Sequence, residues 1–191
     1  MERITPSDGA RGHPNLDTGA RLFQCAAVAL DTAQEFSVEI NATPAQCFDV
    51  ILDFERYDQW CSTISEARVL ERDRAGVGRV VEFFLDMKIR TVRYVLEYAF
   101  KRPTELIWHS VDGDVEWIEG RYRFRKVRPA TTEATCRQEI RLGFWMPGPL
   151  RKLAERTALR QSVVEFKAEV ERRVAAGLEA KHKVEGARRK R

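Results

Sequence analysis

Hydrophobic and polar residues alternate with a period of two over several segments in the middle of the chain. In the clearest segment, 79–89, the residues of one parity are Val81, Phe83, Leu85, Met87 and Ile89. The same alternation occurs in segments 36–40, 65–72, 91–100, 105–111, 115–127 and 134–144. It is typical of strands with one buried face. The pattern therefore predicts a sheet of about seven strands.

Short turn motifs separate the last six of these segments. Glycines at 76 and 78 precede segment 79–89, and Asp112-Gly113-Asp114 is a tight hairpin signal. Consecutive hairpins make an antiparallel meander, whose second face can be solvated. Because a long antiparallel sheet twists and coils, we expect this one to be curved.

Three helices are predicted around the sheet. Thr43 is a candidate N-cap and Pro44 suits the first helical position, so a helix should run from there to about Asp53. A second short helix is predicted over 55–62. A long helix is predicted over 149–176, roughly 40 Å in length, with Gly177 as its stop. Its apolar stripe consists of Leu159, Val163, Phe166, Val170 and Val174.

These elements predict one α+β domain over 35–176, in which one sheet face and the apolar stripe of the last helix bury each other. Curvature would leave space between sheet and helix, and ligand sites are usually concave and mostly apolar. Residues 1–34 are expected to be disordered or loosely attached, with 20–30 as a short strand or a helical turn. Residues 177–191 form a basic tail.

The order of several motifs resembles that of a known superfamily. The motifs are Asn41-Ala-Thr-Pro44 leading through Phe48, Asp53 and Tyr57 to Trp60, the Gly76/Gly78 turn, Pro103 before Ile107-Trp108, and Gly120-Arg-Tyr122-Arg-Phe124. Over 35–173 the chain is similar to the SRPBCC (START-like, helix-grip) superfamily, and within it to the polyketide cyclase/dehydrase and coenzyme Q-binding group. The resemblance implies the helix-grip fold and a cavity. Functions in this superfamily include lipid carriage, quinone binding, aromatase/cyclase activity and small-molecule reception.

Strand parity predicts which residues would line that cavity. The sheet would contribute Phe83, Leu85, Met87, Tyr94, Tyr98, Tyr122, Leu142 and Phe144, and the last helix Phe166 and Val170. The tyrosines are of interest because a phenol combines an apolar body with a hydrogen-bonding tip. All these residues could instead be packed core, and both interpretations stay open. Tyr57 and Trp60 could line the cavity mouth or anchor the short helices.

We assign no catalytic residue. His109, the only histidine in the predicted domain, is the one candidate general base, but it shares a strand face with Ile107 and Val111 while Trp108 points the other way. Four arginines could bind an acidic or enolate ligand. Parity places Arg93, Arg121 and Arg123 outside, in ion pairs with Glu97, Glu116 or Glu119, and leaves Arg90 ambiguous.

Neither a metal site nor a cofactor is expected. No second histidine or carboxylate pair has a ligating spacing. The cysteines at 25, 47, 61 and 136 lack CxxC spacing, so we expect reduced, buried thiols.

The basic character of the chain is confined to its tail. Residues 177–191 hold six positive and two negative side chains, a net +4 that equals the net charge of the whole chain. The positive ones are Lys181, Lys183, Arg188, Arg189, Lys190 and Arg191. They could contact RNA or an anionic membrane nonspecifically, or form a solvated end. With no secretory h-region or spanning stretch, a cytoplasmic protein is expected, with peripheral membrane contact as an option.

The sequence favours binding or carriage of a hydrophobic small molecule, such as a lipid, quinone or polyketide, without chemistry. Two alternatives remain open. One is a polyketide aromatase/cyclase, in which polar groups of the pocket orient a poly-β-keto chain. The other is an interaction module that contacts a ribosome or membrane surface through the basic tail.

Overall fold

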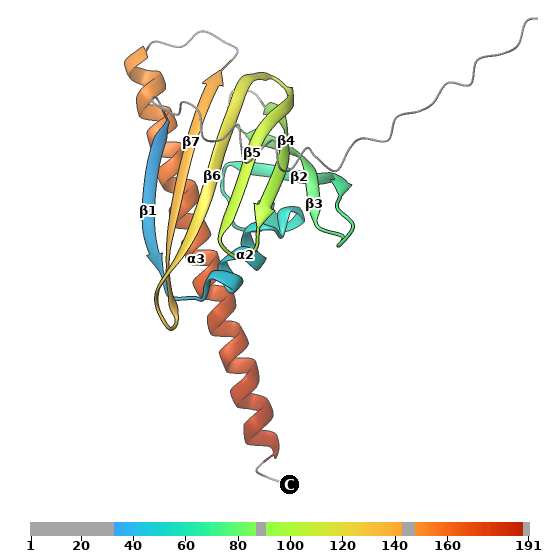
Figure 1. Ribbon diagram of the computed structural model, residues 1–191, viewed down its shortest axis with the longest axis vertical. Coiled ribbons are helices and arrows are strands. Elements are labelled where there is room, and N and C mark those ends of the chain that lie inside the picture. Colours follow the sequence, from blue (N-terminus) through green and yellow to red (C-terminus); the bar gives the residue numbers. More distant parts are fainter. Residues whose placement is uncertain (1–32, 87–90, 143–147, 189–191) are drawn as a thin grey trace, which may run out of the picture.

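A computed structural model describes residues 33–86, 91–142 and 148–188. Within them, seven strands form one antiparallel sheet (Figure 1). The strands are β1 (Gln34–Ile40), β2 (Ile64–Arg72), β3 (Gly78–Asp86), β4 (Thr91–Lys101), β5 (Glu105–Gly113), β6 (Val115–Arg128) and β7 (Thr131–Leu142). Their order is β1-β7-β6-β5-β4-β3-β2, so β2 to β7 form a meander and β1 pairs with β7. The predicted architecture is confirmed.

The first helix, α2 (Pro44–Ile51), begins as the sequence predicts. The backbone N–H of Gln46 donates to the Thr43 hydroxyl at 3.4 Å, and the N–H of Thr43 donates to the Gln46 side-chain oxygen at 2.9 Å. This reciprocal pair is a capping box, which satisfies two N–H groups that a helix start would otherwise leave unbonded. The second short helix, η1 (Phe54–Gln59), is a 3₁₀-helix.

The last helix, α3 (Gly148–Arg188), runs past the predicted stop at Gly177. A glycine inside a helix costs about 1 kcal/mol relative to alanine, but Ala175, Ala176 and Leu178 beside it are strong helix formers. The end of α3 projects beyond the sheet (Figure 1). Among the described residues, no helix is sufficiently long and apolar to span a membrane. Contact of the basic tail with RNA or membrane stays a prediction.

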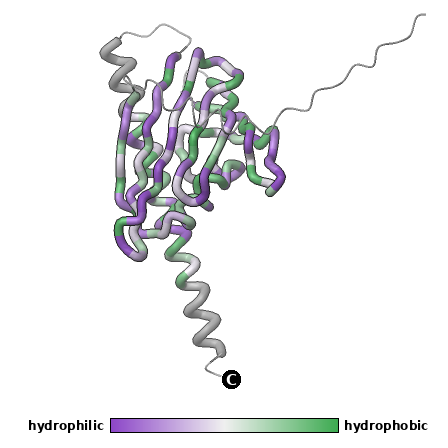
Figure 2. Tube along the Cα trace, viewed as in Figure 1, coloured by the Kyte–Doolittle hydropathy of each residue, from purple (hydrophilic) through white to green (hydrophobic). Residues whose placement is uncertain are grey.

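The core lies between the concave face of the sheet and the middle of α3. Of the predicted stripe, Leu159, Val163, Phe166 and Val170 are buried, and Val174 is partly buried against the same core. Phe166 has its ring centroid 6.1 Å from that of Trp60 and 5.4 Å from that of Tyr122. Hydrophilic and hydrophobic positions mix along the strands because only one face is covered (Figure 2).

Ion pairs cover the outer face of the sheet. Arg93 binds Glu82 at 2.6 Å and Asp112 at 2.9 Å, and Arg123 binds Glu105 at 3.3 Å. Both arginines thus point outward as predicted, although their partners are not the expected ones.

Arg121 does not follow the ion-pair prediction. It lies opposite Arg137 across β6 and β7, and burial together with Arg123 and Arg137 lowers its pKa. Among the described residues, Arg121 has no ion-pair partner within 4 Å. Arg90 lies outside the described residues.

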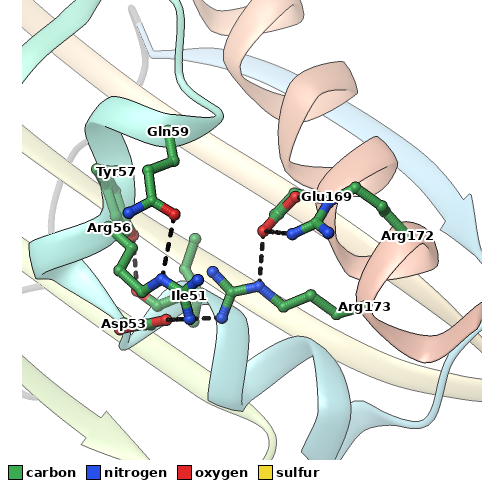
Figure 3. A network of polar contacts seen from close by, with 8 residues as sticks. All are labelled: Ile51, Asp53, Arg56, Tyr57, Gln59, Glu169, Arg172 and Arg173. Atoms are coloured by element: carbon green, nitrogen blue, oxygen red, sulfur yellow. Dashed lines mark hydrogen bonds and ion pairs between the residues drawn. The ribbon is translucent and has the colours of Figure 1, made fainter. Parts of the chain in front are cut away.

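A partly buried polar network joins α3 to the segment between α2 and η1 (Figure 3). The guanidinium of Arg173 donates to Asp53 at 2.6 Å and to Glu169 at 2.6 Å, and Arg172 donates two further bonds to Glu169. Beside it, the Tyr57 hydroxyl donates to the carbonyl of Ile51 at 2.6 Å. The Arg173–Asp53 bond thus joins the start of η1 to α3, and the Tyr57 bond joins η1 to α2.

The network predicts an acid-sensitive stability. Hydrogen bonds from Arg172 and Arg173 lower the pKa of Glu169 from 4.5 to about 2. Because folding lowers this pKa, the ionised Glu169 carboxylate stabilises the folded protein above pH 4.5. This stabilisation is lost as the pH falls toward 2. Glu169→Gln should therefore reduce the free energy of unfolding at pH 7 by about 2 kcal/mol and flatten its decline below pH 4.5.

Urea denaturation between pH 3 and 7 measures this effect. The matched control is Glu133→Gln, which removes a more exposed ion pair with Arg125 and should cost less than about 1 kcal/mol. An unchanged pH profile in Glu169→Gln would contradict the assignment.

Candidate functional site

A cavity of about 270 Å³ lies between the concave face of the sheet, the segment around η1 and the first part of α3. Strands β3 and β4 supply one wall, formed by Phe83, Leu85, Val92, Tyr94, Leu96 and Tyr98. Strands β5 to β7 supply another, formed by Leu106, Trp108, Val115, Ile118, Tyr122, Cys136, Gln138 and Ile140. The remaining lining comes from Ile51, Tyr57, Trp60, Cys61, Thr63, Ile64, Ala158, Leu159 and Ser162.

Half of the residues predicted for the cavity line it. These are Phe83, Leu85, Tyr94, Tyr98 and Tyr122, all on strands whose parity is evident from the sequence. Met87 and Phe144 lie outside the described residues, as does the side chain of Leu142.

Phe166 and Val170, predicted for the opposite wall, are not part of the lining. Both side chains are fully buried in the core. The helical wall lies one to two turns earlier, at Ala158, Leu159 and Ser162. The apolar stripe of α3 is continuous, but only its first part faces the cavity, because the rest packs directly on the sheet and α2.

Tyr57 and Trp60, considered for the cavity mouth or as anchors of the short helices, both belong to the cavity lining. Their rings lie 4.6 Å apart. The Tyr57 hydroxyl also anchors η1 through its bond to Ile51. A large aromatic side chain can contribute one edge to the core and another to a cavity wall.

Several lining residues were not predicted although the sequence carries their signal. Leu96 lies between Tyr94 and Tyr98 on the same face, and Ile118 shares the parity of Tyr122. Trp108 is the cavity-facing neighbour of His109. The lining residues of α3 and of segment 61–64 could not be predicted, because no periodic pattern in the sequence shows that they face the cavity.

The described lining contains no aspartate, glutamate, lysine, arginine or histidine. Its titratable groups are four tyrosines and two thiols, and burial raises the pKa of each. For Cys136 the pKa rises to about 12. All six groups are thus neutral near pH 7, and none is poised to act as a general base. Among the described residues, no cluster suits a metal ion.

His109, the one candidate general base, lies on the outer face of the sheet. Its Nε2 is 3.7 Å from a carboxylate oxygen of Glu97, directly across β4 and β5. Burial lowers the pKa of His109, and Glu97 partly opposes this shift. Because neighbouring residues of a strand face opposite ways, Trp108 lines the cavity and His109 does not.

The position of Trp108 depends on Gly120. The two residues pair across β5 and β6, and a Cβ at position 120 would lie 2.4 Å from the Trp108 ring. Gly120→Ala should therefore displace the indole, lower the free energy of unfolding by about 1–3 kcal/mol and change the tryptophan fluorescence.

Denaturant titration followed by fluorescence measures both effects. The control is Gly177→Ala. A Cβ at position 177 meets nothing within 4 Å, so this substitution should leave the stability unchanged or raise it. Equal stability of Gly120→Ala and the wild-type protein would show that this close approach is not real.

The chain matches one protein-family model and resembles several solved structures. The family model described as "Polyketide cyclase / dehydrase and lipid transport" matches residues 40–167. No curated protein matches the chain.

Three solved structures illustrate the likeness, each 18% identical to this chain. A START superfamily protein from Mycobacterium smegmatis has a TM-score of 0.68, over 73% of this chain and 97% of that one. The Zhui aromatase/cyclase from a Streptomyces species has a TM-score of 0.63, over 74% and 94% of the two chains. A protein from Thermus thermophilus also has a TM-score of 0.63, over 76% and 98%. Such similarity establishes the fold.

Proposed function

The chain belongs to the polyketide cyclase/dehydrase and lipid transport family, and from this premise we propose that it binds a hydrophobic small molecule in its cavity without transforming it. One observation carries the proposal. The described lining is mainly aromatic and aliphatic, and its polar side chains, such as Thr63, Gln138 and Ser162, carry no charge. Such a surface favours an apolar ligand through the hydrophobic effect and offers few groups for chemistry.

The cost of leaving the cavity unfilled by side chains supports the same conclusion. Protein interiors normally hold few voids larger than a water molecule. Compared with a filled core, a void of 270 Å³ would cost on the order of 6 kcal/mol. Larger residues at small positions such as Ala158 would reduce this cost. The space is therefore better explained by a ligand than by stability.

The volume favours a compact ligand. Drug-sized ligands occupy pockets of roughly 300–1,000 Å³, and this cavity is close to the lower limit. A molecule of two or three fused rings, or a quinone ring with a short chain, suits this space better than an enclosed diacyl lipid.

The alternative is a polyketide aromatase/cyclase, which the family and the fold of the Streptomyces enzyme favour. Ring closure by aldol chemistry needs a group that can take up a proton near neutral pH. The raised pKa values of the cavity tyrosines and thiols argue against such a group in the described lining. Binding is therefore the better supported function.

Ligand retention tests the proposal directly. The protein, purified gently without detergent, should carry a small molecule in native mass spectrometry. A panel of quinones, aromatic ketones and lipids should raise its thermal midpoint, by roughly 5 to 10 °C at a concentration about 100 times Kd. No retained ligand, together with an unchanged midpoint across the panel, would refute the proposal.

Filling the cavity should abolish this response. Ile140→Trp replaces an aliphatic side chain of the lining by a bulky indole and should remove the ligand-induced shift while the protein stays folded by circular dichroism. His109→Ala is the matched control, because it alters β5 of the same sheet on the face opposite the cavity and should leave the shift unchanged. A normal shift in Ile140→Trp would place the ligand elsewhere.

Ligand binding should not depend on pH between about 6 and 8. Burial raises the pKa values of the tyrosines and thiols of the lining above their ordinary values of 9 to 10, so these groups keep their protons in this range. Isothermal titration with a neutral ligand of the panel measures this. A bell-shaped profile, or a change in the products formed from an unreduced poly-β-keto substrate, would favour the cyclase instead.

A further inference from the structure

Two tyrosine hydroxyls in the cavity wall have no hydrogen-bond partner in the described part of the chain. They belong to Tyr94 and Tyr98, which lie on the same face of β4. The other two tyrosines of the lining differ. Tyr57 donates to the carbonyl of Ile51, and the Tyr122 hydroxyl lies against the thiol of Cys136. Buried tyrosine hydroxyls usually find a partner, so the free pair indicates that a partner comes from outside the protein.

The two free hydroxyls are accessible from the cavity. The indole N–H groups of Trp60 and Trp108 also lack partners, but surrounding atoms seal them off completely. The hydroxyls of Tyr94 and Tyr98 are not among these sealed atoms, although the whole Tyr98 side chain is only 7% exposed. A ligand in the cavity can therefore reach a phenol but not an indole N–H.

The chemistry of the phenols determines which ligand atoms suit them. Burial raises the pKa of both tyrosines, so each keeps its proton and can donate it to an acceptor oxygen. Four residues along a strand separate their Cα atoms by roughly 13 Å, so the two hydroxyls serve different parts of the cavity.

The lack of a positively charged side chain in the described lining disfavours ligands that carry a carboxylate. A carboxylate moved into an apolar cavity needs a cation, and the described lining contains none. The guanidinium of Arg93, on the same strand as Tyr94 and Tyr98, lies on the outer face and binds Glu82 and Asp112. Arg173 of α3 is bound to Asp53 and Glu169.

We propose that the cavity selects neutral, compact molecules that carry an acceptor oxygen such as a ketone or quinone carbonyl, which Tyr94 or Tyr98 binds, and discriminates against carboxylates such as free fatty acids. This inference rests on the proposed function, because it specifies the ligand of the same site. It assigns Tyr94 and Tyr98 as the residues that determine specificity.

Three probes with the same ring system test the inference. They are 2-acetylnaphthalene, 2-ethylnaphthalene and 2-naphthoate, which place a ketone, a hydrocarbon and a carboxylate on one naphthalene. Dissociation constants are measured for the full chain by isothermal titration. At pH 7 the ketone should bind at least about tenfold more tightly than the carboxylate, whose binding should strengthen toward pH 4 as it becomes protonated.

Hydroxyl deletion identifies the donor. Tyr94→Phe or Tyr98→Phe should weaken binding of the ketone up to about tenfold and leave the hydrocarbon unchanged. The hydrocarbon thus also verifies that each variant retains a folded cavity. Tyr57→Phe is the matched control, because its hydroxyl is already bonded to Ile51, and it should affect both probes equally.

The outcomes separate the two levels of the proposal. If the wild-type protein binds the probes but neither variant alters ketone affinity relative to the hydrocarbon, the inference is wrong while ligand binding stands. The same holds if the carboxylate binds as tightly as the ketone at pH 7. If none of the three probes binds and the ligand panel also has no effect, both the inference and the proposed function are overturned.

Discussion

The packing of α3 into the concave face of the sheet is the constraint on which the rest of the structure depends. Phe166 is its centre, because this fully buried ring contacts Trp60 beside η1 and both Tyr122 and Phe124 on β6. Burying such an aromatic residue contributes a large share of core stability. Where α3 packs in this way the space is filled, and nearer its start, at Leu159 and Ser162, it borders the cavity. One helix therefore both closes the core and limits the ligand space.

Charge is distributed in a way that keeps this cavity neutral. Arginines and carboxylates pair on the outer face of the sheet, and a second group pairs where α3 meets the segment before η1. The second group joins Asp53 to Arg173 and Glu169, which is only 7% exposed. It holds the cavity wall around Tyr57 and Trp60 without placing an ion among its apolar residues. The polar groups left in the described lining are neutral: hydroxyls, thiols and the amide of Gln138.

This arrangement explains why one fold can serve both carriers and enzymes. The sheet and helix provide an apolar enclosure, and the activity depends on the few polar groups placed inside it. In this chain the described lining offers phenols and thiols with raised pKa values, which recognise a ligand better than they move its protons. That set is the basis of the proposal that the cavity binds a neutral small molecule.

Local patterns in the sequence determined the strands, the face that each residue occupies, and the start of α2 at Thr43 and Pro44. Alternation of period two and a capping box act between residues close in the chain, so the parity of Tyr94, Tyr98 and Tyr122 could be predicted. Only the tertiary structure decided that Arg93 pairs with Glu82, and that Leu159 borders the cavity while Phe166 does not. The first outcome depends on the register between β3 and β4, and the second on where the helix crosses the sheet. Contacts between residues more than a hundred positions apart, such as Asp53 and Arg173, set the position of the helix. A periodic pattern within one segment of the sequence holds no information about such contacts.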